Sequence, residues 1–184
     1  MESFLVSTGI VALAEIGDKT QLLALVLAAR FRRPWPIMAG ILFATLLNHA
    51  AAAAVGAWAG DFLHGPYGRW LLALSFFAVA VWALIPDRLD GDSVGRRRAG
   101  AFLTTLVCFF LVEIGDKTQV ATVALAATYD AVTAVVLGTT LGMMIANVPA
   151  VLIGERAATR LPLRLIRSVA AAAFAALGLF VLLA

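Results

Sequence analysis

The sequence contains little charge, one cysteine and two histidines. Only 14% of its 184 residues are charged, against roughly 25% in soluble globular domains, which excludes an ordinary soluble domain. The single cysteine, Cys108, rules out an intramolecular disulfide. So few cysteines and histidines also give no basis for the thiolate or multiple-imidazole sites that select zinc or copper(I).

Hydrophobic residues fill most of the chain instead. They make up 62% of it, and the mean hydropathy is +0.97. A helix needs about 20 mostly apolar residues to cross a bilayer core of roughly 30 Å. Six stretches meet or approach that length: near 3–29, 34–60, 69–85, 99–127, 130–153 and 163–184. These features predict an all-α membrane protein with six transmembrane helices. The first stretch lacks a basic n-region and is interrupted by charges, so we expect it to be a span rather than a cleaved signal peptide.

The distribution of arginine between the spans predicts the orientation. The links after the first, third and fifth spans are rich in arginine, whereas those after the second and fourth contain only Arg69. Because short cytoplasmic loops carry an excess of Lys and Arg, both termini are predicted to lie outside the cytoplasm. No link is long enough for a soluble catalytic or nucleic-acid-binding domain. We therefore expect a membrane transporter rather than an enzyme, with the lipid bilayer as its surroundings and no nucleic-acid partner.

The chain also contains an internal repeat. The stretch LAEIGDKTQLL begins at Leu13, and LVEIGDKTQVA begins 98 residues later. Gly40 and Gly138 are related by the same offset, and the pattern predicts two three-helix repeats, residues 1–85 and 99–184, joined by a cytoplasmic linker at 86–98. Because three spans are an odd number, the second repeat must enter the membrane from the opposite side. Inverted repeats of this kind are typical of secondary transporters, whose substrate site lies near the middle of the membrane.

Each copy of the motif places a Glu, an Asp and a Lys near the middle of a span. A charge at that depth costs about 2.5 to 3.5 kcal/mol, so six of them would cost roughly 15 to 20 kcal/mol unless they pair or face water. On a continuous helix with about 100° per residue, the Asp and the Lys lie on either side of the Glu. Each helix would then show one polar stripe that can face its twin.

The charges of the two stripes predict a cation site. Four carboxylates and two ammonium groups leave a net charge of about −2, which suits one divalent cation. Oxygen ligands favour Ca²⁺, Mn²⁺ or Mg²⁺, and the candidate metal ligands are Glu15, Asp18, Glu113 and Asp116. We expect the empty site to take up protons and to release them when a metal binds. The metal is then a transported substrate, and no prosthetic group is expected.

The other motif residues have supporting roles in this interpretation. Lys19 and Lys117 cannot bind a cation and are assigned to charge balance. Gly17 and Gly115 make local unwinding easier and could free a carbonyl as a ligand. The remaining polar residues are left open. Thr20 and Thr118 could bond to their own helix backbone or coordinate the metal. Four amides could be accessory ligands or could bond neighbouring helices: Gln21, Gln119, Asn48 and Asn147.

The doubled pattern E-x-G-D-[KR]-[TS] resembles the Gdt-type cation exchanger family, which is related to the lysine-exporter superfamily. Residues 15–20 and 113–118 match it at every defined position. The resemblance implies transport of Mn²⁺ and Ca²⁺ in exchange for protons, with the two Glu and two Asp residues of the motifs as metal ligands. It also implies manganese export across the inner membrane of a bacterium.

Several alternatives remain open from the sequence alone. One is a buried salt-bridge network without a transport role. The others are an exporter of an organic cation or amino acid, an intramembrane acidic hydrolase, and a channel. The sequence does not rank Mn²⁺ against Ca²⁺, and it leaves open whether the protein is a homo-oligomer.

Overall fold

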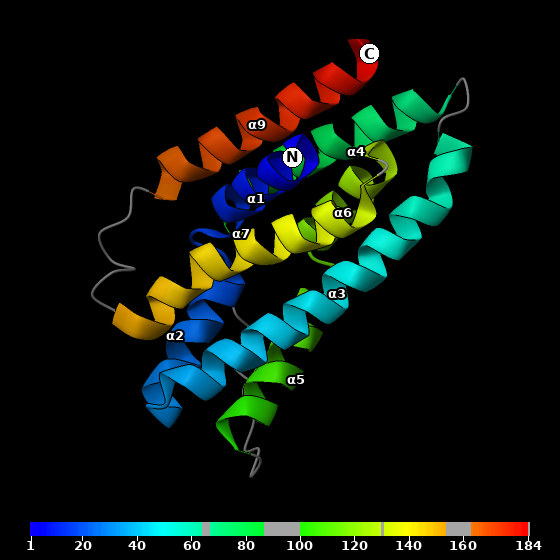
Figure 1. The fold of residues 1–184 in the computed structure, drawn as a ribbon. Coiled ribbons are helices and arrows are strands. Elements are labelled where there is room, and N and C mark those ends of the chain that lie inside the picture. Colours follow the sequence, from blue (N-terminus) through cyan, green and yellow to red (C-terminus); the bar gives the residue numbers. More distant parts are fainter. Residues whose placement is uncertain (64–66, 87–99, 130, 154–162, 184) are drawn as a thin grey trace.

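The computed structural model describes residues 1–63, 67–86, 100–129, 131–153 and 163–183, and every regular element in these ranges is a helix (Figure 1). The all-helical prediction is confirmed. The helices are α1 (Glu2–Glu15), α2 (Lys19–Phe31), α3 (Pro34–Leu63), α4 (Gly68–Ala83), α5 (Ala101–Glu113), α6 (Lys117–Thr128), α7 (Val132–Ile153) and α9 (Leu163–Leu183).

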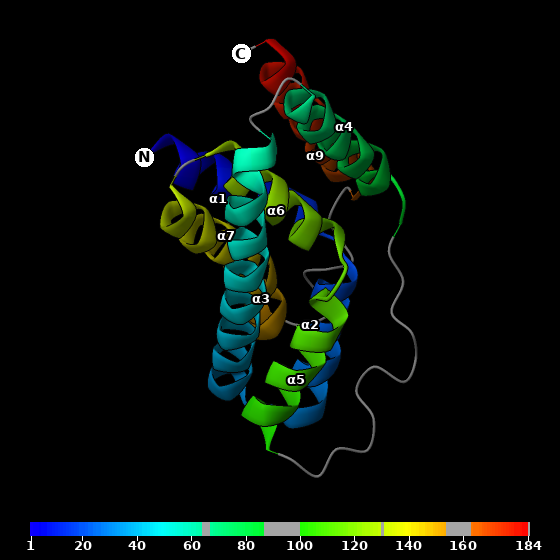
Figure 2. The same ribbon diagram turned by 90° about the vertical axis from the view of Figure 1, so that its right-hand side faces the viewer.

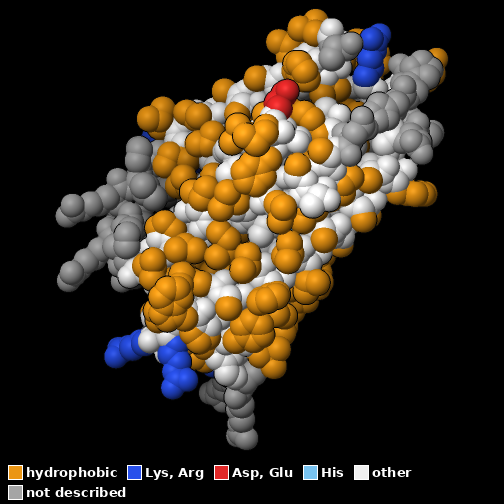
Figure 3. Space-filling model, viewed as in Figure 1, with side chains coloured by type: hydrophobic (Ala, Val, Ile, Leu, Met, Phe, Trp, Pro, Cys, Tyr) orange, Lys and Arg blue, Asp and Glu red, His pale blue; other side chains and the backbone are white. Residues whose placement is uncertain are grey.

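Three of the helices are long and apolar enough to cross a membrane. They contain the stretches Pro34–Gly60, Val132–Leu152 and Arg164–Leu183, each close to a predicted span, while α4 is apolar but shorter. Large apolar side chains point outward along these helices. Trp58, for example, is 83% exposed. Hydrophobic side chains dominate the face shown in Figure 3, and Lys and Arg side chains lie near its edges. Such a surface suits a lipid environment.

The continuous helix assumed for the polar stripe is not present in either motif, whereas the local unwinding that Gly17 and Gly115 were expected to favour does occur. The first predicted span is divided into α1 and α2, and the fourth into α5 and α6. The chain breaks at Gly17 and Gly115, whose φ angles are 83° and 76°. Glycine adopts this left-handed region at little cost because it has no Cβ. Glu and Asp of each motif therefore belong to different half-helices, and the polar stripe of a continuous helix does not form.

The half-helices pack against α3 and α7. α1 lies along α7, whereas α5 and α6 lie along α3; Figure 2 shows α3 with α5 beside its lower part and α6 beside its upper part. Glycines permit the close approach. A Cβ at Gly40 of α3 would lie 2.8 Å from the carbonyl oxygen of Phe102 in α5, and one at Gly138 of α7 would lie 2.6 Å from that of Phe4 in α1.

Helices α4 and α9 lie side by side and form a pair next to α1 and α6 (Figures 1 and 2). Their contact is formed by fully buried aromatic side chains, Phe76 and Phe174, together with small residues of the same core cluster. Of the four half-helices, α1 and α6 thus lie between the long helices, α7 and α3, and the α4–α9 pair, whereas α2 and α5 pack on α7 and α3 away from that pair. The predicted linker at 86–98 lies almost wholly outside the described residues, so the structure does not bear on it.

Candidate cation site

Three motif carboxylates meet where the half-helices end. Glu15 is the last residue of α1, Glu113 is the last of α5, and Asp116 directly precedes α6. One oxygen of each lies within 4.8 Å of the others, and all three residues are buried. The two copies of the motif therefore form one acidic cluster, although 98 residues separate them.

Each break is held by a side-chain amide from the following helix. The backbone N–H of Gly17 donates to Gln21 Oε1 at 3.0 Å, and that of Gly115 donates to Gln119 Oε1 at 2.7 Å. Gln21 also donates through Nε2 to the Ala146 carbonyl of α7 at 2.9 Å. These amide oxygens bond backbone groups left without an intrahelical partner by the break. In this structure the two glutamines stabilise the breaks rather than face the carboxylate cluster.

Two ion pairs connect the copies of the motif crosswise. Lys19 Nζ lies 2.9 Å from Asp116 Oδ1, and Lys117 Nζ lies 2.9 Å from Asp18 Oδ2. Each lysine thus balances an aspartate of the other copy. Asp18 also accepts the backbone N–H of Lys19 at 2.5 Å, as the N-cap of α2. Asp18 is not one of the three clustered carboxylates, and its two oxygens bond to the cap and to Lys117.

The two glutamates have different surroundings. Glu15 accepts the hydroxyl of Thr20 at 2.5 Å and also the hydroxyl of Thr118 from the other copy. Both threonines thus bond to a carboxylate. The bond to their own helix backbone, one of the two roles left open above, is not the one that forms. Glu113 is 1% exposed, and neither of its oxygens has a hydrogen-bond partner among the described residues. A buried carboxylate without a partner is unfavourable, and a bound cation would supply one.

The two asparagines bond backbone carbonyls. Asn48 of α3 donates to the Phe110 carbonyl of α5 at 3.1 Å, which is the bond between helices that the sequence left open. Asn147 donates within α7 to the Met143 carbonyl at 3.0 Å, and its Oδ1 has no partner within the described residues. Neither of these two contacts involves the three clustered carboxylates.

One contact at the site involves a residue that the motif did not indicate. Arg167 of α9 donates from Nη2 to the carbonyl oxygen of Gly17 at 3.4 Å. The sequence held a signal for it, because Arg69 precedes it by the same 98 residues that separate the two motifs.

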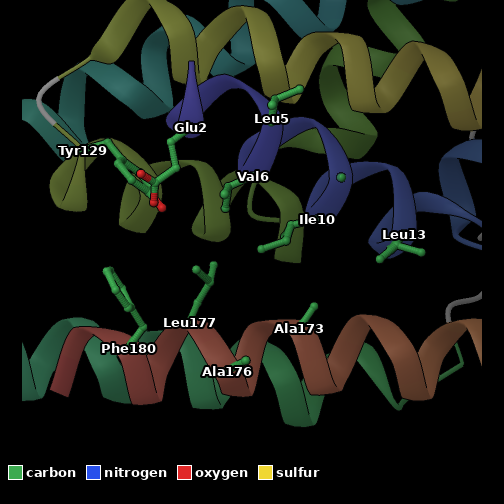
Figure 4. A pocket seen from close by; sticks show the side chains of 11 residues that line it. Glu2, Leu5, Val6, Ile10, Leu13, Tyr129, Ala173, Ala176, Leu177 and Phe180 are labelled. Atoms are coloured by element: carbon green, nitrogen blue, oxygen red, sulfur yellow. The ribbon is translucent and has the colours of Figure 1, made fainter. Parts of the chain in front are cut away.

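A separate cavity of about 500 Å³ lies between α1 and α9. Its lining is apolar except near one end, where Figure 4 shows Glu2 beside Tyr129. None of the motif residues lines it. An apolar groove with a single carboxylate does not suit a cation with its several oxygen ligands, so the candidate site is the buried cluster and not this cavity.

The fold and the cluster define a helical membrane protein with a buried acidic site at broken helices. The chain belongs to the family of divalent cation/proton antiporters named GDT1, whose model matches residues 3–91 and 101–184. The sequence-based recognition of this family is confirmed, and the protein is accordingly a member of a family of transporters.

Relatives extend across bacteria and plants. The chain is 52% identical over 186 residues to a "Putative manganese exporter" of Vibrio cholerae serotype O1, covering 100% of this chain and 89% of that protein. It is 26% identical to GDT1-like protein 5 of Arabidopsis thaliana, covering 90% of this chain and 89% of the relative. A GDT1-like protein of Synechocystis sp. is 27% identical, with 83% and 82% covered. No solved structure matches the chain.

Proposed function

We propose that this protein exports Mn²⁺ from the cytoplasm in exchange for protons, with Ca²⁺ as a second candidate cargo. The observation that carries the proposal is the cluster of Glu15, Glu113 and Asp116, whose oxygens lie within 4.8 Å of one another and are buried. Carboxylate oxygens at such spacing are suitable ligands for both ions. The family of divalent cation/proton antiporters and the relative named for manganese export support this choice of cargo.

We further propose that the chain is built as two inverted three-helix repeats, residues 1–85 and 99–184, around this site. Contacts that recur at an offset of 98 support this architecture. Gly40 approaches Phe102 and Thr105, and Gly138 approaches Phe4 and Ser7, which are the equivalent residues of the other repeat. The two crossed ion pairs are equivalent in the same way, because Lys19 and Lys117, like Asp18 and Asp116, are 98 residues apart. The six spans would be α1–α2, α3, α4, α5–α6, α7 and α9, with both termini outside the cytoplasm in the inner membrane of a bacterium.

Exchange follows from competition for the same oxygens. Metal ligands must be deprotonated, so a bound cation displaces protons and protons displace the cation. If the site opens to one side of the membrane at a time, each cycle carries the cation outward and protons inward. Glu15, Glu113 and Asp116 would hold the ion directly, and Asp18 could join them only after leaving Lys117. Glu113 has no competing hydrogen bond in the described structure and is the most available ligand.

The proposal is tested by metal-driven proton movement in proteoliposomes with a pH-sensitive dye inside. Mn²⁺ should drive proton movement in the parent protein, whereas Glu15→Gln and Glu113→Gln should abolish it. Glu2→Gln is the matched control, because Glu2 is exposed and outside the site. Parent-like exchange in both site variants would overturn the assignment. Inhibition by excess lysine or arginine would favour an amino-acid exporter instead.

A further inference from the structure

Arg167 and Arg69 occupy equivalent positions in α9 and α4. They are 98 residues apart, and the burial of the two helices agrees at this offset. Phe76 and Phe174 are both fully buried, and the paired small residues are also buried, Ala73 with Ala171 and Ala80 with Gly178. The two arginines therefore start from matching places on matching helices, and any difference in their contacts is a difference between the two halves.

Their contacts do differ. Arg167 is half-buried and donates to the Gly17 carbonyl at 3.4 Å. Arg69 is exposed, and no bond from it to the Gly115 carbonyl is found in the described part of the chain. The two helix breaks also differ in solvent exposure. Ile16 and Gly17 are half-buried, whereas Gly115 is exposed and Ile114 is 54% exposed. The break that has an arginine partner is the covered one.

The chemistry of a broken helix explains why an arginine suits this place. Carbonyl groups at a helix C-terminus lack an intrahelical donor and carry a partial negative charge that favours a cation. Gly17 follows the end of α1, and Gly115 follows the end of α5. A guanidinium group has several N–H donors and keeps its charge in an apolar environment. It can therefore hold such a carbonyl while the transported cation is absent.

We propose that Arg167 and Arg69 are positioning residues that alternate in bonding the two break carbonyls as the site opens to opposite sides. Arg167 bonds the Gly17 carbonyl and closes the side on which α9 begins, and Arg69 bonds the Gly115 carbonyl in the opposite state. This inference rests on the proposed inverted repeat and its orientation. In that orientation α9 begins at the cytoplasmic side, so the state described here is closed to the cytoplasm and open to the outside.

The test is thiol labelling from each side of the membrane. Cys108, the only native thiol, is 1% exposed and is replaced by Ala. A single cysteine is then introduced at either of two equivalent positions, as Ile16→Cys or Ile114→Cys. A membrane-impermeant maleimide is applied to right-side-out and to inverted vesicles. We expect Ile114→Cys to react from the outside and Ile16→Cys to be protected.

Arg167→Gln should then raise labelling of Ile16→Cys from the cytoplasmic side by about fivefold, the effect of losing one weak charged hydrogen bond. Arg69→Gln, the matched control, should leave this labelling unchanged or lower it. Arg167→Lys keeps the charge and a donor, and it should restore most of the protection. It also provides a second variant if Arg167→Gln fails to insert.

Equal effects of Arg167→Gln and Arg69→Gln, or no effect of either, would overturn the proposal. So would protection of Ile114→Cys from the outside in the parent. Metal-driven proton movement by the Cys108→Ala parent is measured alongside. Its absence would refute the proposed exchange, whereas labelling needs no metal and tests the arginine pair separately.

Discussion

The crossed ion pair between Lys117 and Asp18 allows a quantitative prediction. Its two side chains are 3% and 0% exposed, and the Nζ–Oδ2 distance is 2.9 Å. Breaking a buried pair by removing one partner costs about 3 to 5 kcal/mol, because the other charge remains buried. Lys117→Met should therefore lower the melting temperature of the metal-free protein in detergent by roughly 10 °C, taking about 2 to 4 °C per kcal/mol for a chain of this size.

The same variant should respond more strongly to metal. Without Lys117, Asp18 is released toward the site and the cluster has one more net negative charge, so added Mn²⁺ should restore more stability in Lys117→Met than in the parent. Lys117→Met combined with Asp18→Asn removes both charges and should recover most of the loss without metal. Lys19→Met should lower the melting temperature less than Lys117→Met does, because Lys19 is 22% exposed and water can take the place of its ammonium group. Equal melting temperatures for the single and double variants would refute the reasoning.

Three further variants test the breaks, the hydroxyl bond and the helix contact. Gly115→Ala should lower the free energy of unfolding by about 1 to 2 kcal/mol, because the φ of Gly115 is 76°. Steric overlap is not the cause, since a Cβ there would meet no atom within 4 Å. Gly9→Ala is the control, because Gly9 lies within a helix and is equally open, and it should not destabilise the protein. Thr118→Val should weaken Mn²⁺ binding, measured by calorimetric titration, by about ten- to a hundredfold, because it removes a hydroxyl that orients the Glu15 carboxylate. Thr118→Ser keeps the hydroxyl and should bind Mn²⁺ like the parent. Gly138→Leu should abolish folded, membrane-inserted protein on size-exclusion chromatography, since a Cβ there already lies 2.6 Å from a backbone oxygen of α1.

The sequence predicted the helices better than the breaks. The stretches 34–60, 130–153 and 163–184 correspond closely to α3, α7 and α9, because length and apolar content decide a membrane helix. The breaks at Gly17 and Gly115 could not be placed in this way. A glycine inside a helix costs only about 1 kcal/mol, so its presence allows either a continuous or a broken helix. The broken form is stabilised by bonds to Gln21 and Gln119, and these form only after the break exists.

At the candidate site, too, some features could be predicted from the sequence and others could not. Residue chemistry selected the carboxylates of the two motifs as candidate ligands, since charge in an apolar span needs a partner. It could not distinguish Asp18 from Asp116 or Glu15 from Glu113, because the two copies of the motif are identical in sequence. These differences depend on which copy donates a hydroxyl or an ammonium group to the other. Only the packing of the half-helices determines that.

Neither of the two proposed repeats contains the whole carboxylate cluster or a complete set of packing partners. Each motif alone has two carboxylates and one lysine, but each lysine pairs with the aspartate of the other copy. Helix α1 packs on α7, and α5 packs on α3, so the half-helices of each repeat lie against the long helix of the other. In the proposed exchange, a movement of one repeat would therefore change the candidate ligands, the ion pairs and the helix contacts of both. This interlocking gives a physical reason why the proposed site, shared by the two repeats, would bind on one side and release on the other without opening to both at once.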